Sequence, residues 1–179
     1  MTLLIDRTSS SRRLAVPDSR AWCEGQTIFI SSEMGELGEL RERLAAALRD
    51  LGFTVIYFED LGGRDENAET AYLDGVARSD IYLGVIADRY GRMLESGRSP
   101  THEEYRAARA EGKRISVWVA ADGSSRQGNA RDFVQELQAF HTTGNFRDTD
   151  DLAARVTERL AEIGVTASNP RQSPNIAAY

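Results

Sequence analysis

The sequence has few of the residues that build covalent or metal cross-links. Its 179 residues include one cysteine, Cys23, and two histidines, His102 and His141. A single cysteine cannot form a disulfide or a zinc-thiolate cluster within the chain, and the histidines follow no metal-ligand spacing. We therefore expect no metal site, no resident cofactor and a reducing cytoplasm as the location. Cys23 is a poor candidate for a catalytic thiol because it lies in an irregular N-terminal stretch.

Long apolar runs and an excess of positive charge are also missing. No stretch approaches the roughly 18 apolar residues of a membrane span, and "MTLLIDRTSSSRRLAVP" lacks the continuous apolar core of a signal peptide. The net charge of −6 and the isoelectric point of about 5.1 argue against a general nucleic-acid-binding surface, which needs a basic face. A nucleotide pocket needs only a few local donors, so the composition does not exclude a small nucleotide as partner.

Strand and helix patterns alternate along most of the chain. The strands are short apolar runs, and the helices repeat apolar residues every three or four positions. The predicted strands are 27–31, 53–58, 80–87, 114–120 and a short 144–147, and the predicted helices are 35–52, 66–79, 100–111, 130–140 and 148–164. This alternation predicts an α/β fold in which helices cover both faces of a parallel sheet. Five strands favour a flavodoxin-like three-layer sandwich with strand order 2-1-3-4-5.

The composition of the two ends differs from that of the alternating region. Residues 1–25 are rich in Ser, Arg and Asp, which predicts a flexible arm with a short helix near Ala21 and Trp22. Residues 26–164 form the predicted α/β domain, and residues 165–179 are typical of a tail or linker.

Polar residues follow the first three predicted strands, where this fold class binds its ligands. Ser31 and Ser32 follow the first strand and are positioned to bind phosphate or ribose, or to cap the next helix. Arg64 follows the second strand and would grip a phosphate or lie in solvent. Arg89 and Tyr90 follow the third strand, where the first would meet a phosphate and the second would stack on a base.

The helix predicted at residues 100–111 starts with an acid that has two possible roles. Thr101 and Glu104 have the spacing of a capping box, in which Glu104 fastens the helix. Alternatively, Ser99 caps the helix with Pro100 in its first turn, which leaves Glu104 available for chemistry. In either case the helix dipole favours an ionised carboxylate, which can stabilise or attack an oxocarbenium-like sugar. His102, at the same helix start, is expected to face solvent.

Three stretches carry a resemblance to a known family: "IFISSEMGELGELRERLAAALRDLG", "YFEDLGGRDENAETAYLDGVARSDIYLGVIADRYG" and "SPTHEEYRAARAEGKRISVWV". Over residues 27–147 they resemble a TIR-like domain of unknown function, which is found ahead of NACHT-type ATPase, tetratricopeptide or WD-repeat regions in signalling proteins. The family usually carries Thr-Phe-Arg-Asp after the two serines, where this chain has Glu-Met-Gly-Glu. It usually has an acid at the position of His102.

That family is similar to two better understood groups, the TIR domains, some of which cleave NAD, and the nucleoside 2-deoxyribosyltransferases. In the second group, a glutamate that precedes a Gly-Lys pair by the spacing seen here is the nucleophile at the sugar. The resemblance therefore places Glu104, and not Glu103, at the catalytic position, and it places Asp80 near the nucleoside.

Three hypotheses follow from these residues and this resemblance. The first is an NAD(+) glycohydrolase that takes NAD as substrate and serves as the effector domain of a bacterial antiphage defence protein, active when its parent assembles. The second is a non-catalytic module that binds a nucleotide signal or self-associates. The third is a structural adaptor in which Glu104 only caps a helix.

Overall fold

A computed structural model describes residues 16–33, 37–57 and 68–168. In these residues the strands are β1 (Thr27–Ser32), β2 (Thr54–Ile56), β3 (Ile81–Ile86), β4 (Arg114–Ala120) and β5 (Gly144–Phe146). They form one parallel sheet in the order β2-β1-β3-β4-β5, which confirms the predicted topology. The order changes direction between β1 and β3, so the carboxyl ends of these two strands mark the expected ligand site.

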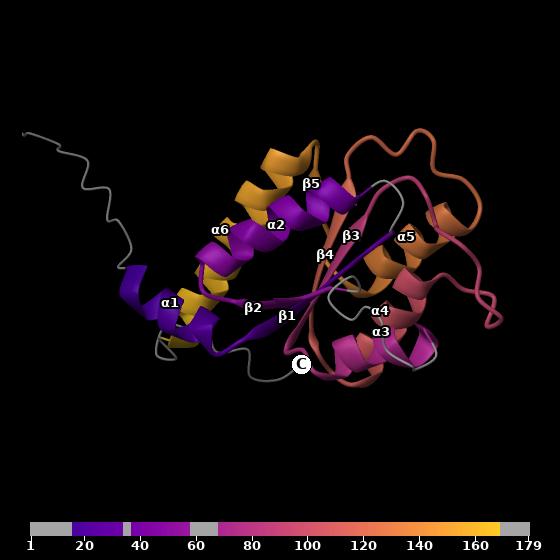
Figure 1. The fold of residues 1–179 in the computed structure, drawn as a ribbon. Coiled ribbons are helices and arrows are strands. Elements are labelled where there is room, and N and C mark those ends of the chain that lie inside the picture. The colour runs from indigo at the N-terminus through magenta and orange to yellow at the C-terminus, as the bar shows by residue number, and fades with distance from the viewer. Residues whose placement is uncertain (1–15, 34–36, 58–67, 169–179) are drawn as a thin grey trace, which may run out of the picture.

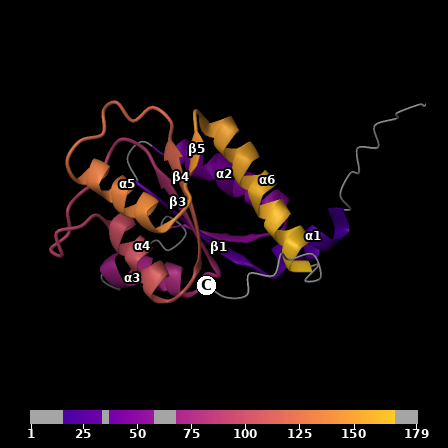
Figure 2. The same cartoon turned by 180° about the vertical axis from the view of Figure 1, so that it is seen from behind.

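Helices cover both faces of the sheet. They are α1 (Val16–Glu24), α2 (Gly38–Asp50), α3 (Ala68–Ala77), α4 (Pro100–Ala110), α5 (Asn129–Phe140) and α6 (Thr149–Ser168). Figure 1 shows α1, α2 and α6 on one side and α3, α4 and α5 on the other, and the view from behind in Figure 2 shows the same layers. None of the helices in the described residues is both long and apolar enough to cross a membrane.

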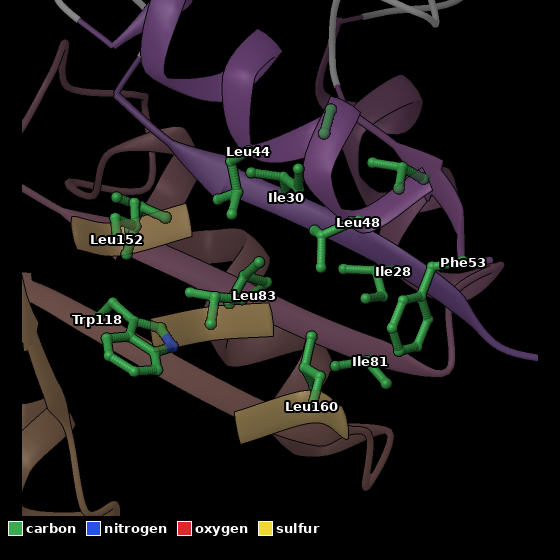
Figure 3. Packing of buried hydrophobic residues seen from close by; sticks show 14 of the residues in the cluster. Ile28, Ile30, Leu44, Leu48, Phe53, Ile81, Leu83, Trp118, Leu152 and Leu160 are labelled. Atoms are coloured by element: carbon green, nitrogen blue, oxygen red, sulfur yellow. The ribbon is translucent and has the colours of Figure 1, made fainter. Parts of the chain in front are cut away.

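The core beneath α2 and α6 is mainly aliphatic. Successive strand residues point to opposite faces, so Ile28 and Ile30 of β1 face the same helices as Leu83 of β3. Leu44 of α2 and Leu152 of α6 close over them, as Figure 3 shows. These side chains are almost fully inaccessible to solvent, so this layer supplies much of the hydrophobic stabilisation of the fold.

The core on the opposite face contains more aromatic rings. Phe29 and Tyr82 point to this side from β1 and β3, and Tyr105 of α4 and Phe133 of α5 pack over them. Their rings form a chain of contacts, with centroids 6.5 Å apart for Phe29 and Tyr82 and 5.8 Å apart for Tyr105 and Phe133. Two of these rings carry hydroxyl groups, which place polar atoms inside this layer.

Both ends of the described chain differ from the sequence prediction. The predicted helix near Trp22 is present as α1, but it packs against α6 and belongs to the folded body. Trp22 contacts Phe53 edge to face and Cys23 is buried in the core, so apolar contacts hold this helix in place. At the other end α6 continues to Ser168, beyond the predicted boundary at residue 164.

Candidate active site

The two serines at the end of β1 point to opposite faces of the sheet. Ser31 lies on the side of Phe29, toward α4, and Ser32 lies on the side of Ile30, toward α2, because side chains alternate along a strand. Both serines are buried. They therefore belong to two separate hydrogen-bond networks, although they are neighbours in the sequence.

Ser31 connects Glu104 to Tyr82. The Ser31 hydroxyl donates a hydrogen bond to Oε2 of Glu104, and the Tyr82 hydroxyl donates to Oγ of Ser31 at 2.9 Å. The carbonyl oxygen of Thr101 is a second acceptor within reach of the Tyr82 hydroxyl, at 3.2 Å. Glu104 is only 5% exposed, so these bonds hold a carboxylate inside the protein and orient it.

A glycine makes room for the Tyr82 ring. Gly84 pairs with Ser31 across the β1–β3 ladder and lies on the same face as Tyr82. A Cβ atom at Gly84 would lie 3.0 Å from Cε1 of Tyr82, which is tighter than side chains normally pack. The absence of a side chain at Gly84 thus allows the ring to lie along the strand and to bring its hydroxyl to Ser31.

The Tyr82 hydroxyl is a neutral hydrogen-bond donor. Burial, and then the nearby charge of Glu104, raise the pKa of Tyr82 well above its ordinary value of 10.0. At neutral pH the ring therefore keeps its proton and supplies it to Ser31 or Thr101.

Glu104 is not needed to cap its own helix by side-chain bonding. Ser99 is the N-cap residue of α4, its hydroxyl accepts a hydrogen bond from the backbone N–H of His102 at 3.3 Å, and Pro100 follows at the first helical position. Of the two helix starts that the sequence allows, the structure adopts the Ser99 start. The neighbouring acid, Glu103, is directed elsewhere, with Arg98 Nη1 at 3.3 Å from its Oε1.

Ser32 lies in the second network with an arginine that the sequence analysis did not select. Nη1 of Arg41 donates to Oγ of Ser32 and to the carbonyl oxygen of Glu33, both at 3.0 Å. Arg41 is 4% exposed and orders the backbone just after β1. Its helical spacing relative to Leu37, Leu44 and Leu48 places it on the buried stripe of α2, and this was the signal available in the sequence.

The expectation that His102 faces solvent is wrong. His102 is 8% exposed, and its ring stacks on Phe133 with centroids 4.2 Å apart. Its Nδ1 lies 2.7 Å from the Tyr90 hydroxyl and its Nε2 lies 3.0 Å from Oε2 of Glu136 on α5. Burial lowers the pKa of His102 below its ordinary value of 6.5, although the Glu136 carboxylate opposes that shift.

A shallow hollow that opens to solvent, with enclosed room for about one water molecule (about 10 Å3), lies next to these networks. Ile86 and Phe133 contribute to its apolar part, and Glu33, Thr101 and Tyr90 contribute polar groups. Thr101 lies one helical turn before Glu104 on α4. Its carbonyl oxygen is an acceptor for the Tyr82 hydroxyl, which also bonds Ser31. The hollow therefore borders the Ser31 network, although its lining in the described residues does not include Glu104 itself.

The loop after β3 carries two predicted site residues to this hollow. Arg89 is exposed and Tyr90 is half-buried, and both line the hollow. Gly91 follows with φ of 83°, and a Cβ there would lie 3.3 Å from Cγ of Glu33. The loop after β3 is thus in close contact with the loop after β1, as a shared site requires.

Two predicted residues are not part of this group. Asp80 precedes β3 at the amino edge of the sheet, where its Oδ2 accepts from the backbone N–H of Thr27 at 2.8 Å. It lies four residues before Gly84, about 13 Å along an extended strand, so the structure does not bring it to the Glu104 network. The carboxylate instead joins the starts of β1 and β3. Arg64 lies outside the described residues.

Comparisons with known proteins agree with this architecture. A family model described as "Domain of unknown function (DUF4062)" matches residues 27–161. No curated protein matches the chain. The structure is similar to that of the CMP N-glycosidase BcmB from Clostridium botulinum, with a TM-score of 0.53 and 13% identity over 75% of this chain and 99% of that chain. That identity establishes a shared fold and nothing further.

Two other solved structures show weaker similarity. The TIR domains of the activated Roq1 resistosome, which recognises the effector XopQ, give a TM-score of 0.47 with 14% identity, covering 85% of this chain and 92% of that chain. Oxidised flavodoxin 1 from Bacillus cereus gives 0.38 with 13% identity, covering 83% and 98%.

Proposed function

The chain belongs to the DUF4062 family, and we propose that it cleaves the N-glycosidic bond of a nucleotide, with NAD as the first substrate to test and Glu104 as the group that acts on the sugar. One observation carries this proposal. The Glu104 carboxylate is buried on α4 beside the carboxyl end of β1, where the Ser31 hydroxyl donates to it and the Tyr82 hydroxyl from β3 in turn donates to Ser31.

The reaction needs little beyond one such carboxylate. When the bond between C1′ and the nicotinamide nitrogen breaks, the electron pair goes to the pyridinium nitrogen, and nicotinamide leaves as a neutral molecule. Positive charge develops on C1′ and the ring oxygen of the ribose. The Glu104 carboxylate stabilises that charge or bonds to C1′, and water then adds at C1′ and loses a proton to give ADP-ribose.

The surrounding residues have complementary roles in this proposal. The Ser31 hydroxyl, itself held by the Tyr82 hydroxyl, orients the Glu104 carboxylate. Arg41, which donates to Ser32 and to the carbonyl oxygen of Glu33, orders the backbone after β1 on the opposite side. Arg89 at the rim of the hollow would hold a phosphate, and Tyr90 would contact the base.

The biological setting in this proposal follows from the resemblance of the sequence to TIR-like domains of signalling proteins. The domain would act as the effector of a defence protein, with activity that rises when several copies assemble. A nucleotide would then be its small-molecule partner, and further copies or further domains would be its protein partners.

The test compares two adjacent glutamates. Wild-type, Glu104→Gln and Glu103→Gln proteins are incubated with NAD at high protein concentration, and nicotinamide release is followed by chromatography. We expect Glu104→Gln to lower turnover by about a hundredfold to a thousandfold, and Glu103→Gln to leave it nearly unchanged, since Glu103 pairs with Arg98 and not with Ser31. Equal turnover by all three proteins would contradict the proposal.

A binding module without catalysis is the second candidate, and the burial of Glu104 favours it. The carboxylate is 5% exposed and does not line the hollow in the described residues, so a ligand in the hollow need not meet it. Calorimetry with NAD and ADP-ribose separates the two candidates. Binding of either ligand without nicotinamide release, also under conditions in which the protein assembles, would support the module.

A further inference from the structure

The contacts of His102 form a second polar chain beside the hollow, separate from the one that holds Glu104. It runs from Glu136 on α5 through His102 on α4 to Tyr90 in the loop after β3. Phe133 stacks on the imidazole, and Tyr90 contacts both rings edge to face, with centroids 5.9 Å from His102 and 6.0 Å from Phe133. The chain thus fixes the position of a ring that lines the hollow.

Hydrogen-bond chemistry determines the direction of both bonds in this chain. An ionised Glu136 carboxylate can only accept, so Nε2 of His102 must carry a hydrogen. In a neutral imidazole Nδ1 is then an acceptor, and the Tyr90 hydroxyl must donate to it. The hydrogen of Tyr90 is therefore used inside the protein, and its oxygen can only accept in any further hydrogen bond.

Protonation of His102 would reverse one of these bonds. With a hydrogen on Nδ1, the imidazolium donates to the Tyr90 oxygen, and the Tyr90 hydrogen becomes available to a ligand. The charged groups that act on this imidazole are Glu136 from α5, Arg106 from α4 and Arg98 from the loop before α4. The two arginines and the buried position oppose a second proton, while Glu136 favours it.

We propose that His102 is a positioning residue that makes the Tyr90 oxygen a hydrogen-bond acceptor at the edge of the hollow, so that the site prefers a base whose substituent carries N–H donors, such as a primary carboxamide. This inference rests on the proposed function, because it assumes that the base of a nucleotide lies over the mouth of the hollow, beside Tyr90. The Tyr90 oxygen would give the hollow a preference for ligands with hydrogen-bond donors, which an apolar lining alone would not provide.

The experiment measures binding and does not depend on turnover. Calorimetry at neutral pH compares NAD with its 3-acetylpyridine analogue, in which a methyl group replaces only the amide nitrogen, on the Glu104→Gln protein. We expect NAD to bind about tenfold more tightly, the usual effect of one hydrogen bond. Adding Tyr90→Phe, which keeps the ring and removes the oxygen, should abolish this preference.

A separate measurement reports which nitrogen of His102 carries a hydrogen. Because the chain contains two histidines, nitrogen NMR resolves both rings, and His141→Gln assigns them and serves as the matched control. We expect His102 to show the Nε2–H form at neutral pH, and the preference for NAD to decrease as His102 becomes protonated. In His102→Gln the preference should be lost, whereas in His141→Gln it should persist.

The outcomes separate this inference from the proposed function. Equal binding of the two dinucleotides, or a preference unchanged by Tyr90→Phe, would overturn the inference even if the wild-type protein cleaves NAD. A preference that depends on Tyr90 and His102 would support it even if no cleavage is detected. Absence of binding of either dinucleotide would overturn both.

Discussion

The helices α2 and α4 begin at the same edge of the sheet but bury different kinds of side chain. The buried face of α2 consists of Leu40, Arg41, Leu44, Ala45 and Leu48, whereas that of α4 consists of Thr101, His102, Glu104, Tyr105 and Ala108. Helix α2 is thus aliphatic apart from one arginine at its start. Helix α4 buries a hydroxyl, an imidazole, a carboxylate and a phenol within five residues, 101–105.

The difference shows where stability and chemistry lie. Buried polar groups contribute little net stability, and apolar side chains of similar size often do as well or better. The polar groups of α4 nevertheless have partners from other elements, Ser31 for Glu104 and both Tyr90 and Glu136 for His102. Stability alone does not explain this arrangement, and the α4 face is therefore the side on which we place the function.

The largest expected effect on stability comes from the α2 face. Leu44 is 1% exposed, so Leu44→Ala should lower the free energy of unfolding by about 2–5 kcal/mol, because it removes buried methyl groups and leaves a cavity. Urea denaturation measures this loss, with exposed Glu42→Ala on the same helix as a control that should change little. Nucleotide binding by the folded fraction should persist, and its loss would contradict the separation of the two faces.

An intermediate effect should follow from filling the space beside Tyr82. Gly84→Ala places a methyl group against the ring and should lower the free energy of unfolding by about 1–3 kcal/mol. It should also displace the hydroxyl from Ser31 and weaken any activity that depends on Glu104.

Two further variants give the Gly84 prediction its controls. Gly38→Ala in α2 meets no atom within 4 Å and should be neutral or slightly stabilising, since alanine favours helices. In the Tyr82→Leu background the cost of Gly84→Ala should fall, because the ring is gone. An equal cost in both backgrounds would show that the ring is not the obstacle.

The smallest expected effect is the pH dependence from the two histidines. Burial lowers the pKa values of His102 and His141 below 6.5, so the folded protein binds these protons less readily than the unfolded chain. Their contribution to stability is complete above pH 6.5 and decreases as the pH falls toward their folded pKa values. Asp151, with a pKa of about 2, would act only below its ordinary value of 3.8 and so outside this window.

Urea denaturation at pH 7.5 and 5.5 measures this effect. The difference in unfolding free energy between the two pH values should shrink in His102→Gln and, by a comparable amount, in His141→Gln. A difference between the two pH values that grows in both variants would show that the sign is wrong for both groups.

The local parts of the fold followed from the sequence, and the polar contacts between elements did not. Apolar runs predicted β4 over its full length, 114–120. Periodicity also contained the information for Arg41, which lies in register with Leu37 and Leu44, but a charged residue on an apolar stripe is usually assumed to face solvent. His102 was misjudged for a related reason, because its partner Glu136 lies 34 residues further along the chain.

The sequence by itself determined the alternation of strands and helices, and hence the parallel sheet and the edge at which a site would form. These features depend on periods of two and 3.6 residues, which are properties of neighbouring positions. Only the tertiary structure decided that Ser99 caps α4, that Ser31 and not Ser32 meets Glu104, and that His102 is buried. Ser31 and Glu104 are separated by 73 residues, and packing of α4 against β1 brings them together.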